Sequence, residues 1–330
     1  MDNNNEITHD FSPFFKVYKD GRIERYMVLD DLPAGLDPES GVLSKDVVIS
    51  PESGVKARIF IPETVGSDQK LPLLVHYHGG GFCAGSAFHI LTKHVLTSTV
   101  SQGNVIAISI DYRLAPEHLL PIAYTDSWDG LEWIAAPEHP IPTGYEDSWT
   151  SLQWVASHAN RHGAEPWLNF YGDFSRVFLA GDSAGANIAY YLAVRIRSVQ
   201  PKMRLAGMIL MHPFFMGSKL DRMWFYLCPR NGGLKDARFK PAAEDMARTG
   251  CERVLVFLAG RDKLKDAGRS FYEELNKCGW EGNADMVEHD GVGHVFHLIK
   301  PRCEQALDMM KRLVSFINQE PVIISWRSKI

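Results

Sequence analysis

A serine between two glycines is the residue of this chain best placed to do chemistry. Ser183 lies in Gly-Asp-Ser-Ala-Gly at residues 181–185, between an apolar run at 177–180 and a helix-favouring series. This order of strand, tight turn and helix predicts a nucleophile elbow, in which a strained serine stands at the carboxyl end of a strand. The flanking glycines leave room for the chain and for a substrate. We therefore predict a nucleophile at Ser183; the alternative is an ordinary glycine-rich turn.

Two further side chains could activate this serine. His294 lies in a glycine-rich loop ahead of the last predicted helix, where an imidazole could act as a general base. Asp262 directly follows an apolar strand, and α/β sheets place site residues at the carboxyl ends of strands. Asp266 and Asp290 are alternatives to it, and His294 could instead be a structural histidine. The order Ser, Asp, His along the chain favours a catalytic triad of Ser183, Asp262 and His294.

Three consecutive glycines predict an oxyanion hole. They occur in His78-Gly-Gly-Gly-Phe, directly after the apolar run at residues 71–77. Glycines leave the backbone N–H groups unobstructed, so such a loop can point two of them at one oxygen. We assign the amides of Gly79, Gly80 and Ala184 to this role. A phosphate-binding loop is excluded because no Gly-Lys-Ser/Thr follows, and a merely flexible loop is the remaining alternative.

Composition excludes several classes of partner. The net charge of −5 and a pI near 6.2 argue against a nucleic-acid partner, and no apolar run approaches the length of a membrane span. His294 and His297 lack a third ligand of suitable spacing, so we predict neither a metal nor a cofactor. The polar, acidic start lacks a secretion signal, and the five dispersed cysteines predict free thiols in a reducing compartment. We therefore expect a cytoplasmic protein, with the nucleus as a further possible location. Cys83, near the proposed site, is either a reactive thiol or a small packing residue.

The elements that position these residues belong to an α/β fold. Apolar runs at residues 71–77, 105–110, 177–180, 205–211 and 254–259 predict interior strands, and the helical patterns between them indicate a mostly parallel sheet. Alternation over residues 45–62 predicts a half-buried antiparallel strand pair. The length of 330 residues suits a single domain over 1–330. The aromatic-rich first 30 residues predict either a helix packed on the body or a flap over the site.

Residues 115–156 contain a tandem duplication. The segments 115–135 and 136–156 are identical at 12 of 21 positions, and each has a proline-rich lead and an Asp-Ser pair before a predicted helix. Two copies are too few for a solenoid, so only one helix can fill the usual place. The preceding Asp111-Tyr-Arg-Leu-Ala-Pro-Glu-His offers an arginine and two carboxylates that could brace the loop behind the site, a structural role more than a catalytic one for Glu117 and His118.

Three motifs together resemble the hormone-sensitive-lipase-like branch of the α/β hydrolases, and they are His78-Gly-Gly-Gly, Asp111-Tyr-Arg-Leu-Ala-Pro-Glu and Gly181-Asp-Ser-Ala-Gly. The stretches Asp173-Phe-Ser-Arg-Val-Phe-Leu-Ala and Gly293-His-Val-Phe-His-Leu are similar to the plant carboxylesterase subfamily. The resemblance covers about residues 10–318. It implies an α/β-hydrolase fold with helices on both faces of the sheet, a cap built largely from about residues 1–40, and hydrolysis of small carboxylic esters through an acyl-enzyme.

Two relatives in the same subfamily supply rival functions. Gibberellin receptors lack the triad histidine and carry serine at the third glycine of the loop, whereas this chain has His294 and Gly81. The 2-hydroxyisoflavanone dehydratases share the fold and often carry threonine as nucleophile, so Ser183 favours the esterase. Three features depart from the family pattern: the duplication at 115–156, the short connection at 218–224 and the tail at 319–330. We expect them to affect stability and the range of substrates more than the chemistry of the triad.

Overall fold

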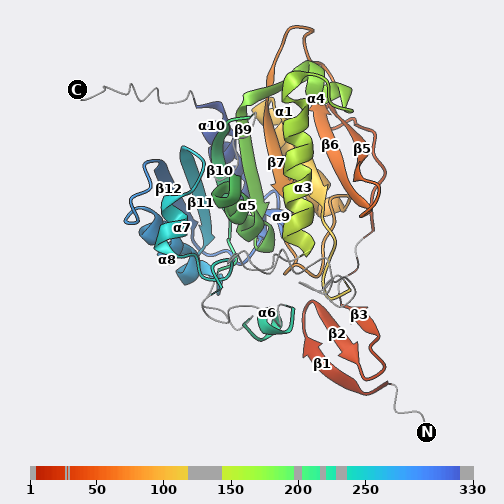
Figure 1. Ribbon diagram of the computed structural model, residues 1–330, viewed down its shortest axis with the longest axis vertical. Helices are drawn as coiled ribbons and strands as arrows, with labels where there is room; N and C mark the ends of the chain where they lie inside the picture. Colours follow the sequence, from red (N-terminus) through yellow and green to blue (C-terminus); the bar gives the residue numbers. More distant parts are fainter. Residues whose placement is uncertain are drawn as a thin grey trace, which may run out of the picture.

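A nine-stranded sheet forms the centre of the molecule (Figure 1). The computed structural model describes residues 5–26, 28, 30–117, 143–196, 203–215, 221–227 and 236–319. The strand order is β12-β11-β10-β9-β7-β8-β6-β5-β4, parallel from β12 to β8 and antiparallel from β8 to β4. The predicted α/β class with a mostly parallel sheet is confirmed. The bounds of the strands are β4 (Leu36–Asp37), β5 (Val42–Ser50), β6 (Val55–Pro62), β7 (Leu71–Tyr77), β8 (Ile106–Asp111), β9 (Gly172–Asp182), β10 (Leu205–Met211), β11 (Arg253–Ala259) and β12 (Asn283–His289).

Alternating side chains of the central strands supply a hydrophobic core on each face of the sheet. On β9, Val177 and Leu179 join one core, and Phe178 and Ala180 join the other. Both faces are covered, which is why the apolar run in this strand is unbroken. Each fully buried Val, Leu or Phe contributes about 1.5–3 kcal/mol before the entropy cost of ordering it. The strand ends that carry the candidate site are therefore firmly held.

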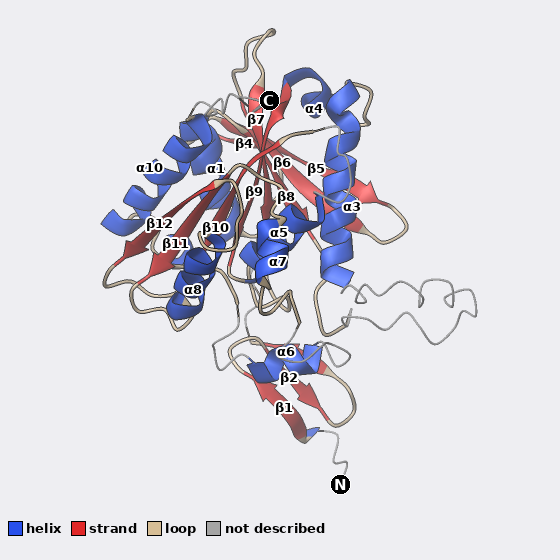
Figure 2. Cartoon of the chain, turned by 60° about the vertical axis from the view of Figure 1, so that its left-hand side comes forward, coloured by secondary structure: helices blue, strands red, loops and turns tan. Residues whose placement is uncertain are grey.

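Helices cover the two faces, as Figures 1 and 2 show. One face carries α3 (Thr143–Ser157), α5 (Ala184–Arg195), α7 (Ala243–Ala247) and α8 (Lys265–Leu275), and the other carries α1 (Ile90–Gly103), α9 (Phe296–Ile299) and α10 (Glu304–Asn318). A 3-10 turn (His158–Asn160) and α4 (Pro166–Tyr171) connect α3 to β9. Of the helices in the described part of the chain, none has the length and apolar character needed to cross a bilayer.

The N-terminal segment forms a small antiparallel sheet beyond the carboxyl ends of the central strands (Figure 1). Its strands are β1 (Ile7–Phe11), β2 (Phe15–Tyr18) and β3 (Ile23–Arg25). The prediction of a helix here was wrong, because the aromatic and β-branched residues of this segment alternate and Gly21, with φ of 84°, permits the tight turn between β2 and β3. Phe11 packs on Tyr226 of α6 (Asp221–Leu227), with ring centroids 4.8 Å apart. The small sheet and α6 thus lie together on this side of the molecule.

Of the tandem duplication, the structure describes residues 115–117 of the first copy and 143–156 of the second copy. Helix α3 comes from residues 136–156, and its Tyr145 hydroxyl donates to Asn187 Oδ1 on α5. The helix predicted in the first copy lies outside the described residues, as do 320–330 of the tail. The second copy therefore occupies the place beside α5.

Candidate active site

The strand-to-helix turn at Ser183 is tightly constrained. Ser183 joins β9 to α5 with φ of 54° and ψ of −116°, a conformation that costs a non-glycine residue energy. Its amide donates to the Met211 carbonyl at 2.9 Å. The flanking glycines are required by packing, since a Cβ at Gly185 would lie 1.9 Å from the Tyr77 carbonyl oxygen and one at Gly181 2.3 Å from that of Gly185. The turn thus presents one strained serine at the end of a buried strand.

The glycine loop after β7 lies against this turn. A Cβ at Gly79 would lie 2.2 Å from Asp182 Oδ2, and one at Gly80, whose φ is 107°, would lie 2.0 Å from the Ala84 carbonyl oxygen. The Cys83 and Ala84 amides both donate to the Gly80 carbonyl at 3.0 Å and fix the loop. No described acceptor pairs with the amides of Gly79, Gly80 or Ala184. Their role as an oxyanion hole stays a prediction, and Ala184 begins α5, whose dipole favours negative charge there.

An imidazole and a carboxylate meet at the ends of two neighbouring strands. His294 Nδ1 lies 2.6 Å from Asp262 Oδ2, and the Leu264 amide donates to Asp262 Oδ1 at 2.9 Å. The Asp262 side chain is 4% exposed and that of His294 is 35% exposed, so the imidazole has an open side. The carboxylate favours the tautomer with its proton on Nδ1, which leaves Nε2 as a base.

Two further predictions concern the rival carboxylates of Asp262 and the contact between Ser183 and His294. Among the described residues, neither Asp266 nor Asp290 makes a hydrogen bond or ion pair with His294. Ser183 Oγ makes no hydrogen bond to a described residue, so its contact with His294 stays a prediction. Such contacts are often long without substrate and tighten when it binds.

A buried charge beneath the elbow was missed by the sequence analysis. Asp182, only 3% exposed, has its Oδ1 3.6 Å from Nε2 of His76, whose Nδ1 lies 3.3 Å from Ser109 Oγ. Burial alone would raise the pKa of Asp182, but the neighbouring imidazoles, first His76 and then His297 and His78, outweigh burial and hold that pKa below its usual value. His76 stands inside an apolar strand, and that position was the available signal for a buried partner.

The motif after β8 braces the loop, as its residue types indicated. Arg113 forms a bidentate pair with Asp147 of α3 at 2.9 and 2.8 Å. Arg25 of β3 pairs in the same way with Glu117, at 2.6 and 2.5 Å, and also donates to the Cys83 carbonyl. The Cys83 thiol is fully buried and donates to the Gly81 carbonyl at 3.1 Å, and burial raises its pKa, which favours the packing role over a reactive thiol. His118 lies outside the described residues.

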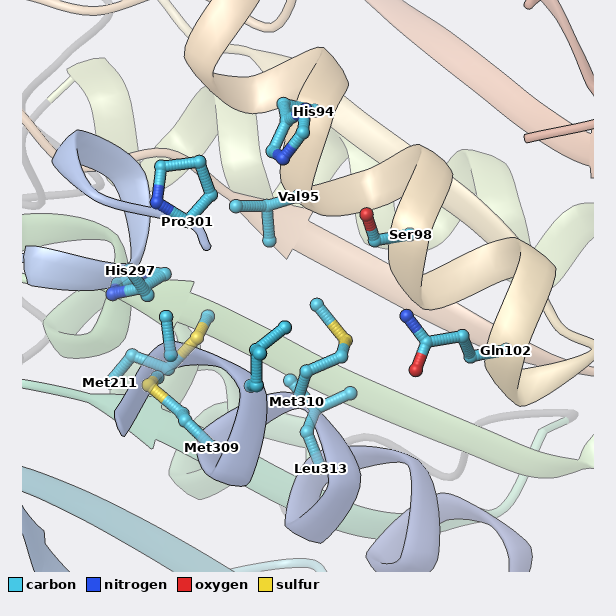
Figure 3. A pocket seen from close by; sticks show the side chains of 12 residues that line it. His94, Val95, Ser98, Gln102, Met211, His297, Pro301, Met309, Met310 and Leu313 are labelled. Carbon is cyan, nitrogen blue, oxygen red and sulfur yellow. The ribbon is translucent and has the colours of Figure 1, made fainter. Parts of the chain in front are cut away.

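A cavity of about 50 Å³ between α1 and α10 is separate from this site (Figure 3). Its wall is mostly apolar and includes Met211, Met309 and Leu313, with the buried His297 at one end. None of the predicted catalytic residues lines it. Its volume suits a few water-sized molecules and not an ester substrate.

Comparison with known proteins identifies relatives along almost the whole chain. A family model described as the alpha/beta hydrolase fold matches residues 74–136 and 135–298. The chain is 40% identical to probable carboxylesterase 1 of Arabidopsis thaliana, over 96% of this chain and 98% of that protein. It is 35% identical to 2-hydroxyisoflavanone dehydratase of Glycyrrhiza echinata, over 94% and 96%. A thermostable esterase from Pseudomonas putida has a similar structure, with a TM-score of 0.65, 20% identity and coverage of 87% and 86%.

Proposed function

Because this chain belongs to the alpha/beta hydrolase family and is a carboxylic ester hydrolase, we propose that Ser183 is its nucleophile, His294 its general base and Asp262 the residue that orients the base. The observation that carries the assignment is the 2.6 Å contact between His294 and the buried Asp262. Asp262 follows β11, and the strained Ser183 follows β9, the second strand from β11 in the sheet. Its substrates are small carboxylic esters.

The reaction proceeds in two halves. His294 Nε2 takes the Ser183 proton as Oγ attacks the ester carbonyl, and the tetrahedral intermediate expels an alkoxide that takes that proton from the imidazole. Water then attacks the acyl-enzyme with the same base, which releases the acid and restores Ser183. Asp262 keeps the imidazole in its tautomer and stabilises the imidazolium.

The amides of Gly79, Gly80 and Ala184 stabilise the oxyanion in both halves. Loss of one such donor typically costs about 3–4 kcal/mol of barrier. The close packing of Gly79 on Asp182 and of Gly80 on Ala84 supports this role, because it holds the donors in place before substrate arrives. No cofactor or metal is needed for this chemistry.

A dehydratase is the second candidate function, because one relative is a 2-hydroxyisoflavanone dehydratase. It would use the same candidate site to remove water from a hydroxylated flavanone. A receptor resembling those for gibberellin is less well supported. The receptors carry serine where this chain has Gly81. Serine at this position would be strained by the φ of 61°, and its Cβ would lie 2.9 Å from both Phe14 and Met223.

We place this activity in the cytoplasm, with the nucleus as a further location. The described cysteines, Cys83, Cys251, Cys278 and Cys303, are all free thiols, which suits a reducing compartment. The small N-terminal sheet and α6 would form a cap over the site.

Hydrolysis of p-nitrophenyl esters of increasing chain length tests the proposal. The wild type is expected to turn over short esters, and Ser183→Ala to lose this activity; Ser175→Ala, a serine on the same strand β9, is the matched control. A Ser183→Ala protein that keeps the wild-type rate would refute the assignment. A hydroxylated flavanone is assayed in parallel, and a new conjugated chromophore would favour the dehydratase instead.

A further inference from the structure

One short segment is hydrogen-bonded both to the turn at Ser183 and to the loop that carries His294. The segment Met211–Phe214 follows β10; its Met211 carbonyl accepts from the Ser183 amide at 2.9 Å, and its Phe214 amide donates to the Ser183 carbonyl at 3.0 Å. On the other side, the Val295 amide donates to Nδ1 of His212 at 3.2 Å. Val295 directly follows the proposed general base. His212 is thus the side chain through which this segment contacts the loop that carries the proposed general base, His294. We call this loop the base loop.

We propose that His212 is a positioning residue, which fixes the backbone at Val295 and thereby sets the imidazole of His294 for catalysis. This inference rests on the proposed function of His294. His212 touches neither substrate nor reacting atoms in this scheme, because it is 1% exposed and acts through the loop.

Val295 needs such support. Its φ of 47° and ψ of 34° place a β-branched residue in the left-handed region, which β-branched side chains rarely adopt. A conformation of this kind persists only where neighbouring contacts determine it. The Val295 amide is the group that His212 holds, and the Leu298 amide donates to the Val295 carbonyl at 2.9 Å. Loss of the first contact frees the loop at the residue next to the base.

His212 is suited to accept this bond over the working pH range. Burial lowers its pKa well below the usual value, and the charges of His297, His294 and His289 lower it further. The imidazole therefore stays neutral, with Nδ1 as acceptor and the proton on Nε2. Its own backbone is also fixed, since φ is 50° and the amide donates to the Phe257 carbonyl at 2.9 Å. The acceptor is held rigidly on the sheet.

A neighbouring histidine provides a matched control. His297 is 5% exposed and its ring centroid lies 5.3 Å from that of His212, yet neither of its ring nitrogens bonds to a described residue. Replacement of His297 by leucine removes the same kind of buried ring without removing a bond to the base loop.

The experiment compares His212→Leu, His212→Asn and His297→Leu in the full-length chain. The amide oxygen of asparagine can replace Nδ1 as acceptor, whereas leucine cannot. We expect His212→Leu to lower kcat on a short-chain ester by about 10- to 100-fold with KM unchanged, because a displaced base slows chemistry and not binding. We expect His212→Asn and His297→Leu to keep most of the wild-type kcat.

A second change tests the strain directly. Glycine adopts a positive φ freely, so Val295→Gly in the His212→Leu background is expected to restore part of the lost kcat. Hydrogen exchange over residues 290–298 gives a readout independent of activity, and it should be faster in His212→Leu than in His297→Leu. Equal exchange and equal kcat in these two variants would overturn the inference. His294→Gln separates the two hypotheses: if it stays active, the proposed function fails, and the exchange comparison still decides whether His212 holds the loop.

Discussion

Acidification should destabilise the fold through His297. Burial lowers the pKa of this histidine from 6.5 to about 4, and the nearby Asp182 opposes the shift without cancelling it. Between those two values the unfolded chain binds a proton that the folded chain does not, so stability falls as the pH falls from about 6.5 to 4. From pH 7 to pH 5 the loss attributable to His297 alone is about 2 kcal/mol.

The His297→Leu variant should lose this part of the pH dependence. The charged and titratable groups that face His297 are present in both proteins, and they are His76, Asp182, His212, His289 and His294. Urea unfolding at pH 7 and pH 5 gives the two free energies of unfolding, with His162→Leu as the control for removal of an exposed imidazole. We expect the difference between the two pH values to be smaller by about 2 kcal/mol in His297→Leu than in the wild type. An equal difference in both proteins would refute the reasoning.

Three further predictions concern the site and its supports. Asp262→Asn should lower kcat by about 10⁴-fold, because an amide in place of the carboxylate favours the wrong tautomer of His294; steady-state kinetics measure it, and a loss under tenfold would contradict the role. Gly185→Ala should destabilise the fold or block its formation, since the new Cβ would lie 1.9 Å from a carbonyl oxygen; thermal unfolding tests it, and a wild-type Tm would be the contrary result. Asp147→Asn should lower the free energy of unfolding by about 1–3 kcal/mol, because it disrupts the pair with Arg113; urea unfolding measures it, and an unchanged free energy of unfolding would contradict the bracing role.

The sequence predicts best what is local. Unbroken apolar runs identify the interior strands, because both faces of a parallel sheet are covered and most residues buried there are apolar. The turn at Ser183 can also be predicted from the sequence, since a Cβ at either of its glycines would clash with neighbouring backbone atoms. Asp262 follows an apolar run that the sequence identifies as a strand, but Asp290 directly follows β12 in the structure, so only the contact with His294, 32 residues from Asp262, separates the two.

The contacts that the sequence did not predict join distant residues. His76 of β7 reaches Asp182 of the neighbouring strand β9, and Val295, after β12, reaches His212, after β10, across the end of β11. A histidine in an apolar strand shows that a polar group is buried, but not which partner it meets. The N-terminal segment was misjudged for another reason, since dense aromatic residues fit a helix or a strand until their alternation is weighed.

The residues proposed for the chemistry and those expected to influence the choice of substrate are held in place by different kinds of contact. Ser183 and the glycine loop are held by backbone bonds and close packing at the ends of the central strands, and His294 is held by its contact with Asp262. The small N-terminal sheet and α6 approach that loop through side chains, because a Cβ at Gly81 would meet Phe14 and Met223, both at 2.9 Å. Side-chain contacts can change without moving the backbone donors. Substitutions at Phe14 or Met223 should therefore alter the preference for the acyl group and KM before they alter kcat on the smallest esters.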